Sequence, residues 1–250
     1  FYDKWYNPAN AVLVVAGDIT QTLLEPIAKR TYGKIPASSP IKRIRPTEPP
    51  QKASRQVMYR DSRVRQASWS KSFLAPSRVT SILDGASKEH SHALEILSAA
   101  IGGGTTSQIY RSLVIEQKLA VSAGTGYSSD PLGPSRFTFY ASPKVGISMK
   151  TIEKAIDTEI DNILSNGVAE EEIVRVKKSM FAQATYARDS LTAGAMSIGS
   201  TLASGKDISD IETWPHRIAN VTVDQINAAA KAIFQNRPSV TALLQGEDKK

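Results

Sequence analysis

The three histidines are the side chains of this sequence best suited to metal binding or acid–base chemistry. His90 and His92 are two residues apart, so on a helix they point in different directions, whereas two metal ligands on a helix need a spacing of three or four. His216 stands alone behind Pro215. The chain has no cysteine, which excludes thiolate metal sites, disulfides and cysteine nucleophiles. We therefore expect structural or surface histidines, no metal site and no catalytic residue.

A glycine-rich segment, Gly102-Gly103-Gly104-Thr105, is the second candidate for chemistry. Glycine loops ahead of a helix can present backbone N–H groups to a phosphate. Here the segment follows a predicted helix rather than a strand, and it lacks both the lysine of a P-loop and the Gly-x-Gly-x-x-Gly spacing of dinucleotide sites. A helix C-cap with a flexible joint is the favoured interpretation, and the phosphate cradle is the alternative. No Gly-x-Ser-x-Gly segment indicates a serine nucleophile.

The basic residues, which give a net charge of +7, are concentrated in one stretch. Eleven of them fall between Lys29 and Arg65, among five prolines and opposed only by Glu48 and Asp61. This distribution is typical of a solvated linker, so we expect no nucleic-acid binding, and a basic module with salt-dependent DNA or RNA affinity is kept as a third alternative. No apolar run approaches the roughly 20 residues that span a bilayer.

The elements that must position these residues follow from hydrophobic periodicity. Near the start, the pattern predicts a helix end at residues 1–6, an apolar strand at 11–16 and a helix at 20–32 that is capped by Thr20 and stopped by Gly33. Further strands are predicted at 55–60, 67–75, 120–127, 137–142 and 240–244, and helices at 93–101, 107–116, 148–164, 169–186, 197–203, 214–218 and 223–234.

A helix stop, an apolar strand, then a glycine and an acid occur at residues 7–18 and again at 237–247. The repetition predicts that residues 1–36 end one structural repeat and that about 52–247 form a second, complete copy. The chain begins inside an amphipathic segment without a signal-peptide pattern, and we interpret it as a fragment of a longer protein.

Three segments carry a family resemblance. Residues 1–18 read FYDKWYNPANAVLVVAGD, residues 101–110 read IGGGTTSQIY, and residues 167–173 read GVAEEEI ahead of a predicted long helix. In this order they resemble the end of the N-terminal domain, the glycine-rich GGG-x-x-S-x-L-Y segment and the G-ϕ-x-x-E-E-ϕ helix start of the pitrilysin/insulinase zinc metallopeptidases, the inverzincins. The closing strand matches that family's last element. The chain resembles the C-terminal, inactive domain together with the last part of the N-terminal domain.

The resemblance implies an α+β fold of the LuxS/MPP-like metallopeptidase type. This is a two-layer α/β roll whose mixed, mostly antiparallel sheet carries helices on one face. The implied organisation is a remnant of the catalytic-type domain at residues 1–36, a basic, proline-rich linker at 37–51 and a non-catalytic domain at 52–250.

The resemblance also implies a function. In this family zinc is held by His-x-x-Glu-His and a distant glutamate, with the motif glutamate as base. This sequence lacks that motif, which the resemblance places upstream of Phe1. The expectation is a substrate-enclosing, non-catalytic domain of a zinc metalloendopeptidase that hydrolyses unfolded peptides, with zinc only in the full-length parent and a periplasmic or otherwise exported bacterial location. A non-catalytic partner or scaffold subunit of a two-chain complex is the alternative, and an intact or broken upstream zinc motif would separate the two.

The resemblance assigns two kinds of site residue. Gly102, Gly103, Gly104 and Thr105 would form a substrate-adjacent joint. Family members that grip substrate in this domain carry an Arg and a Tyr seven residues apart, in L-R-E-x-x-G-L-A-Y.

Alignment on Leu119-Ala120 puts Val114 and Val121 at those two positions, while Arg111 and Tyr127 lie nearby but out of register. The implied consequence is that this domain lacks the Arg/Tyr pair, and that a homologous partner subunit, in a hetero- or homodimer, supplies it.

Overall fold

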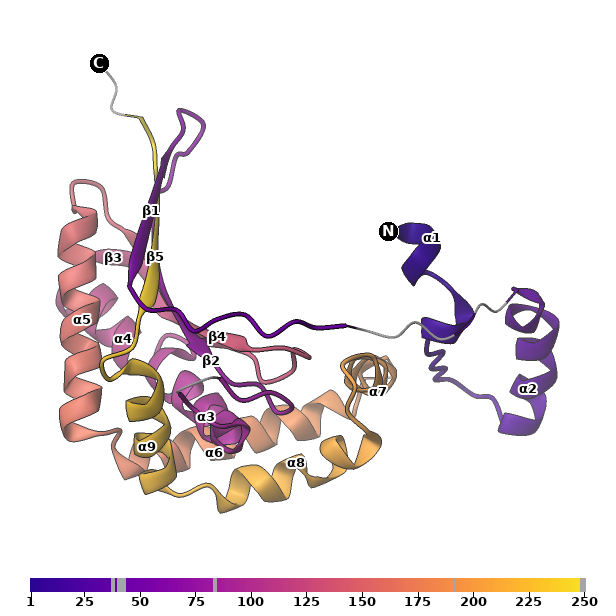
Figure 1. Cartoon of the computed structure of the whole chain (residues 1–250). Helices are drawn as coiled ribbons and strands as arrows, with labels where there is room; N and C mark the ends of the chain where they lie inside the picture. The colour runs from indigo at the N-terminus through magenta and orange to yellow at the C-terminus, as the bar shows by residue number, and fades with distance from the viewer. Residues whose placement is uncertain (37–38, 40–43, 83–84, 191, 248–250) are drawn as a thin grey trace. The chain divides into compact units, whose positions relative to one another are not determined.

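The computed structural model describes residues 1–36, 39, 44–82, 85–190 and 192–247 (Figure 1). The chain divides into two compact units, one made of Phe1–Pro49 with Phe181–Pro215, the other of Pro50–Met180 with His216–Lys250. The predicted linker at 37–51 lies partly outside the described residues. Among the described residues, no helix is both long and apolar enough to cross a membrane.

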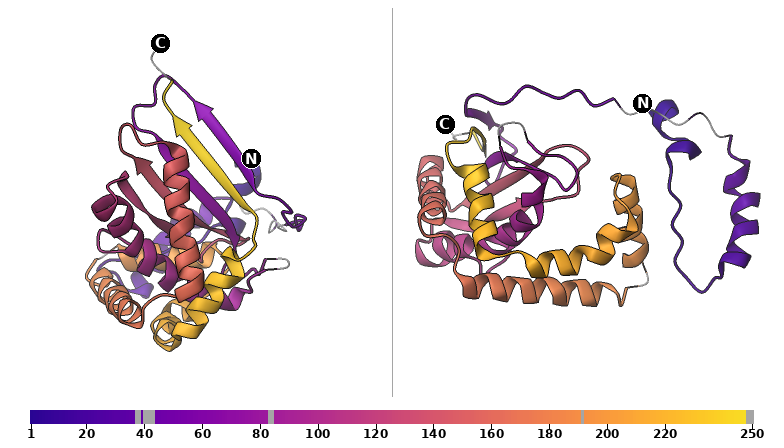
Figure 2. Two further views of the ribbon diagram at one scale, coloured as in Figure 1. Left: turned by 90° about the vertical axis from the view of Figure 1, so that its left-hand side faces the viewer. Right: turned by 60° about the horizontal axis from the view of Figure 1, so that its bottom comes forward.

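A five-stranded mixed sheet forms the centre of the second unit, in the order β1-β5-β2-β4-β3 (Figure 2). β1 runs parallel to β5, and every other neighbouring pair is antiparallel. The predicted mixed, mostly antiparallel sheet is confirmed. The strands are β1 (Arg55–Arg60), β2 (Ser68–Ala75), β3 (Ala120–Tyr127), β4 (Ser135–Pro143) and β5 (Ser239–Gln245).

Helices cover one face of this sheet, and the core lies between the two layers. Strand residues alternate, so Phe137 and Phe139 of β4 point into the core with Phe73 of β2. Their rings pack around Phe234 of a covering helix at centroid distances of 5.1–5.3 Å. The helices of the chain are α1 (Tyr2–Trp5), α2 (Gln21–Arg30), α3 (Ser91–Gly102), α4 (Gln108–Tyr110), α5 (Met149–Asn166), α6 (Glu170–Ala187), α7 (Ala193–Ala203), α8 (Ile208–Asn220) and α9 (Val223–Phe234).

Local sequence signals set the ends of the core helices. Ser148 caps α5 by accepting from the Thr151 amide, and Gly167, at φ +72°, ends it in a conformation that favours glycine. Thr222 and Gln225 form a capping box at the start of α9. These helix starts and stops are therefore readable in the sequence.

The first unit departs from prediction at its apolar segment. Residues 11–16 form no strand, because no other segment of the described chain pairs with them. Thr20 caps α2 as predicted, but the helix ends at Arg30, and Gly33 lies in a short 3-10 turn, η2 (Tyr32–Lys34). The other short 3-10 turns are η1 (Pro8–Asn10) and η3 (Lys88–His90).

Two predicted helices differ in form. The helix predicted at 107–116 begins as α4 and continues as a π-helix, η4 (Arg111–Glu116). The one predicted at 214–218 is only part of α8, which starts at Ile208 and contains Pro215. Pro215 has no N–H to donate within the helix, and the chain tolerates this loss inside the longer α8.

Candidate functional site

The end of α3 lies against β3 because glycines leave room for close contact. A Cβ atom on Gly102 would lie 2.1 Å from the backbone nitrogen of Thr125, and one on Gly124 would lie 2.7 Å from the carbonyl oxygen of Gly102. The Thr125 hydroxyl donates to the Ser98 carbonyl at 2.9 Å. Gly102 is therefore fixed by backbone packing.

The three residues after Gly102 turn outward and are exposed. Gly104 has φ +116°, a conformation that glycine adopts without steric cost, and the Ser107 hydroxyl donates to its carbonyl at 2.6 Å. The Gly103 N–H is bonded to the Ala99 carbonyl at 3.0 Å, so the segment from Gly103 to Thr105 is a solvent-facing turn held at its two ends.

A buried carboxylate anchors the helical segment that follows. Glu159 of α5 is 8% exposed and accepts hydrogen bonds from the Ser112 hydroxyl at 2.5 Å and from Gln108 Nε2 at 3.0 Å. Gln117 Nε2 donates in turn to the Ser112 hydroxyl at 2.7 Å. This network ties both ends of the α4–η4 segment to α5, so the π-helix is held in place by hydrogen bonds to a buried carboxylate.

The two positions aligned with the family Arg/Tyr pair both carry apolar side chains at accessible places. Val114 is half-buried on η4. Val121 is 49% exposed on β3, where the register with β4 shifts between Ala120 and Ser122. Neither side chain offers a hydrogen-bond donor.

Arg111 and Tyr127, the nearby residues of the right type, are engaged elsewhere. Arg111 lies 3.7 Å from the Glu116 carboxylate in an exposed ion pair. The Tyr127 hydroxyl donates to the Pro76 carbonyl at 2.8 Å, and burial, followed by the charge of Glu95, raises the pKa of this phenol well above its ordinary value.

Tyr140 is a candidate that the sequence analysis missed. It pairs across the sheet with Gly124, on the face opposite the helices, and is 43% exposed. Its hydroxyl lies 2.7 Å from the position that a Cβ atom on Gly124 would occupy, and it has no hydrogen-bond partner within the described part of the chain. The available signal was the strand alternation, which puts Tyr140 on the opposite face from Phe137 and Phe139.

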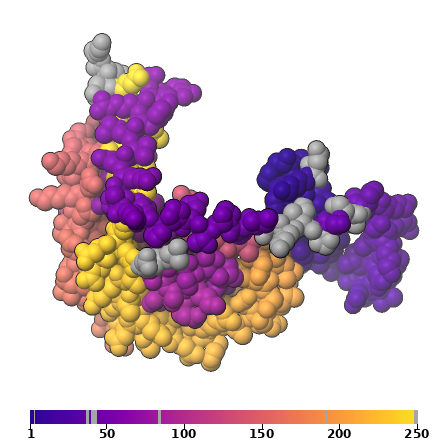
Figure 3. Space-filling model, viewed as in Figure 1, coloured from indigo at the N-terminus to yellow at the C-terminus, as the bar shows by residue number. Residues whose placement is uncertain are grey.

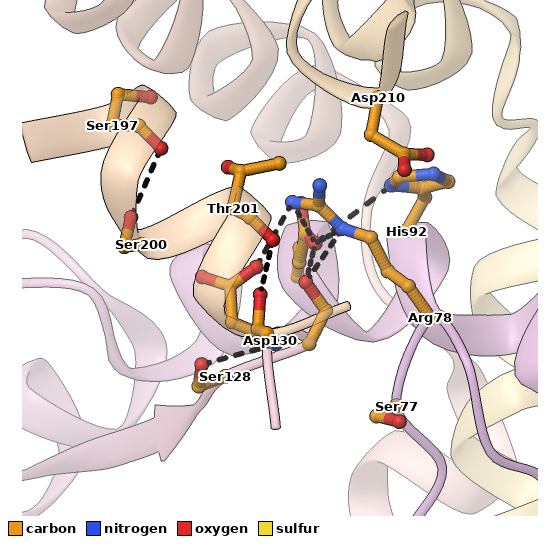
Figure 4. Close-up of polar contacts among 12 residues, drawn as sticks. Ser77, Arg78, His92, Ser128, Asp130, Ser197, Ser200, Thr201 and Asp210 are labelled. Atoms are coloured by element: carbon orange, nitrogen blue, oxygen red, sulfur yellow. Dashed lines mark hydrogen bonds and ion pairs between the residues drawn. The ribbon is translucent and has the colours of Figure 1, made fainter. Parts of the chain in front are cut away.

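A second polar cluster surrounds Arg78, which follows β2 (Figure 4). Its guanidinium lies 3.2 Å from the Glu95 carboxylate, 2.9 Å from the Ser129 hydroxyl and 3.8 Å from Asp130. Ser129 also donates to Glu95, and His92 Nδ1 lies 3.7 Å from the same carboxylate. Because the Ser129 hydroxyl is bound to Glu95 and not to a histidine, the cluster is an ion-pair network that joins three segments, not a nucleophile with its base.

All three histidines line one cavity of about 670 Å³ in the second unit. Within the residues that the structure describes, no group of three His, Cys, Asp or Glu side chains is arranged to hold a metal ion. The cavity is lined by Arg78, Lys88, Glu89, His90, Ser91, His92, Ala93, His216, Arg217, Asn220, Val221, Gln225 and Ala228.

The sheet with helices on one face and the glycine-fixed end of α3 define a recognisable class of domain. A family profile described as the peptidase M16 inactive domain matches residues 1–180, and the chain belongs to this family. The predicted resemblance to an inactive C-terminal domain of zinc metallopeptidases is thereby confirmed.

Individual relatives agree with this assignment. An uncharacterized zinc protease of Streptomyces coelicolor is 24% identical over 257 residues, covering 100% of this chain and 53% of that protein. The crystal structure of a protease from Helicobacter pylori matches with a TM-score of 0.77 at 19% identity, over 92% of this chain and 53% of that one. The periplasmic protease PqqL of Escherichia coli gives a TM-score of 0.67 at 19% identity, over 92% of this chain and 25% of that one.

The chain spans about half the length of the curated relatives it matches.

Proposed function

We propose that the chain is the substrate-enclosing, non-catalytic domain of a zinc-dependent metalloendopeptidase that acts on unfolded peptides. The observation that carries the proposal is the exposed backbone of Gly103–Thr105, held beside a sheet face that the helices leave open, in an M16 inactive domain. The zinc site would lie in a separate part of the parent, and the named zinc proteases among the relatives support this assignment.

The open face of the sheet has the surface that an extended peptide needs. At its centre, small residues on β2 and β3 flank β4, which carries Tyr140 on the same face. Backbone groups and a tyrosine hydroxyl bind a peptide main chain without selecting its side chains, which suits a varied set of unfolded substrates. The small residues on β2 and β3 are Ser70, Ser72, Gly124 and Gly126.

The valines at positions 114 and 121 support the proposal that a second chain supplies the side chains that hydrogen-bond to the substrate. Arg presents a charged fork of donors and Tyr a hydroxyl, both able to bind peptide carbonyls, whereas valine presents neither. Losing such bonds costs about 0.5 to 1.5 kcal/mol each, and about 1.5 to 3 kcal/mol where a charge is involved. We infer that a homologous partner subunit supplies the pair, in a hetero- or homodimer.

The domain limits and location are part of the same proposal. Residues 1–36 would complete an upstream catalytic-type domain, 37–51 would link the domains, and 52–250 would form the non-catalytic domain. The likeness to PqqL, described as periplasmic, supports a periplasmic or otherwise exported location.

The test compares the full-length protein alone with a mixture containing a candidate partner that encodes the Arg/Tyr pair, using an unfolded, internally quenched fluorescent peptide. We expect kcat/KM to rise by about one to three orders of magnitude in the mixture. Equal cleavage by the isolated chain, or loss of activity on Arg111→Ala and Tyr127→Phe in variants that remain folded at the assay temperature, would show that the alignment at Val114 and Val121 is wrong.

A matched pair of variants tests the open face directly. Tyr140→Phe removes the hydroxyl beside the glycine-rich segment and should raise KM several-fold with little change in Tm. Tyr186→Phe makes the same change on an exposed tyrosine of α6 and should leave KM unchanged. Equal effects of the two variants would argue against substrate lying at Tyr140.

The scaffold-subunit alternative is favoured by the same two valines, since a subunit without catalysis has no use for a substrate grip. Zinc analysis of the full-length protein separates the two functions. About one zinc per full-length chain, with none bound by residues 1–250 alone, supports the peptidase, and a metal-free full-length protein supports the scaffold.

A further inference from the structure

β1 is an edge strand that pairs on one side only. In the described part of the chain its single neighbour is β5, and its other edge faces outward (Figure 2). All six of its residues are exposed, including Val57 at 59%, Met58 at 52% and Tyr59 at 59%. An outward edge presents a row of N–H and C=O groups that another extended segment can pair with.

The helical layer ends before it reaches β1. By register Met58 stands beside Leu243 of β5, yet Leu243 is 4% exposed and Met58 is 52% exposed. Figure 3 shows the purple column of β1 at the molecular surface, next to the yellow of β5. The edge is therefore accessible from the side and from both faces.

The charge around this edge is one-sided. Between residues 52 and 65 the only acid is Asp61, whose carboxylate lies 2.7 Å from Arg63. Hydrogen bonds from Arg63 lower the pKa of Asp61 to about 2, so its charge is present and already offset at neutral pH. The other basic residues of this stretch are Lys52, Arg55, Arg60 and Arg65.

Two of these cations bracket the apolar part of the strand. Arg55 shares the open face with Val57 and Tyr59, and Arg60 ends the strand next to Gln245. Within the described residues no carboxylate lies at ion-pair distance from Lys52, Arg55 or Arg65. On the open face the stripe runs cation, apolar, aromatic, from Arg55 through Val57 to Tyr59, and Arg60 lies on the other face with Met58.

We propose that the outer edge of β1 binds an acidic, extended peptide segment of a partner protein as an added strand. The unpaired backbone groups of β1 form hydrogen bonds with the backbone of the peptide. Val57 and Tyr59 contact apolar side chains of the peptide, and Arg55 and Lys52 bind one of its carboxylates. Self-pairing is disfavoured, because an antiparallel second copy centred on Val57 and Met58 would set Arg55 opposite Arg60. A nucleic acid would use the charge but not the apolar stripe or the ladder.

The experiment titrates the chain with the peptide Glu-Glu-Thr-Val-Thr-Val-Glu-Glu, capped at both ends. We expect binding that protects amides of residues 55–60 from hydrogen exchange. The same peptide with Lys for each Glu, and one with Pro for the first Val, should bind at least about tenfold more weakly, because the first loses charge complementarity and the second the ladder.

Charge-reversed variants locate the site. Arg55→Glu should weaken binding about three- to tenfold, since a favourable pair becomes a repulsive one. Arg136→Glu, an exposed arginine on β4 of the same sheet face, is the matched control and should bind as the unchanged chain does.

Several results would overturn the proposal. These are equal binding of the Lys peptide, protection outside residues 55–60, displacement of the peptide by an equimolar single-stranded oligonucleotide, or equal losses for Arg55→Glu and Arg136→Glu. Outward-facing amides of β1, those that do not bond to β5, would overturn it as well if they are already protected in the full-length protein before peptide is added, because the protein's own chain would then occupy this edge.

Discussion

Residues 11–16 and β5 carry the same sequence pattern and have different structures. Each is an apolar run followed by a glycine and an acid. β5 lies between β1 and β2, and its Leu243 is 4% exposed, whereas Val12 is 51% exposed and Leu13 is 53% exposed in a segment without a ladder. A strand pattern therefore becomes a strand only where neighbouring strands and a covering layer are present to pair with it and bury it.

The largest expected difference between the two regions is in hydrogen exchange. In a dilute monomer, amides of residues 240–244 should exchange only through global unfolding, whose free energy is typically about 5 to 15 kcal/mol. Amides of residues 12–15 should exchange with almost no protection. Mass-spectrometric exchange on the 250-residue chain measures both. Equal protection of the two segments would break the comparison.

Truncation of one buried and one exposed side chain tests the same difference between the two regions through the free energy of unfolding. Phe137 is 0% exposed and its ring lies 5.1 Å from Phe234, so Phe137→Ala should lower the free energy of unfolding by about 3 to 5 kcal/mol. Leu23 on α2 is 62% exposed, and Leu23→Ala should change the free energy of unfolding by less than about 0.5 kcal/mol. Urea denaturation of both variants tests this, and similar losses would mean that the first unit has a core of its own.

The Tyr127 phenol should make the second unit sensitive to alkali. Its pKa is raised in the folded state, mainly by burial, so the neutral form stabilises the fold at every pH below the unfolded value of about 10, and this stability is lost as the pH rises further. Tyr127→Phe should cost about 1 to 3 kcal/mol at pH 7, because the Pro76 carbonyl loses its donor, and should flatten the decline above pH 10. An unchanged alkaline decline in the variant would contradict the assignment.

The smallest expected effect compares two helix caps of one type. Thr222 accepts from the Gln225 amide at 3.2 Å, and Thr20 accepts from the Leu23 amide at 3.4 Å. Thr222→Ala should lower the free energy of unfolding by about 1 kcal/mol, because α9 packs on the core. Thr20→Ala should reduce local helicity without moving the main thermal transition, and a shift of that transition would link α2 to the core.

Much of the fold was predictable because short-range rules decide it. The strands β1 to β5, the capped starts of α2, α5 and α9 and the stop at Gly167 follow from alternation and from side chains that satisfy nearby amides. The π-helical form of η4 was not predictable, because it is held through Glu159, which is distant in sequence.

The candidate site was also predictable from the sequence only in part. The types of residue at Val114 and Val121 are fixed by the sequence, and so is the lack of a donor there. The convergence of His90, His92 and His216 on one cavity came only with the structure, because their spacing places them on separate elements.

The sequence by itself determined the order of elements, the buried stripe of each strand and the motifs that mark the family, since these depend on residues close together in the chain. Tertiary structure alone decided that Gly102 contacts Thr125 and that Tyr140 lies against Gly124. It also decided that, among the described residues, β1 has one unpaired edge and residues 11–16 pair with no strand. The physical reason is that long-range pairing depends on which segments meet in space, and a one-dimensional pattern carries the preference of each segment but not the identity of its neighbour.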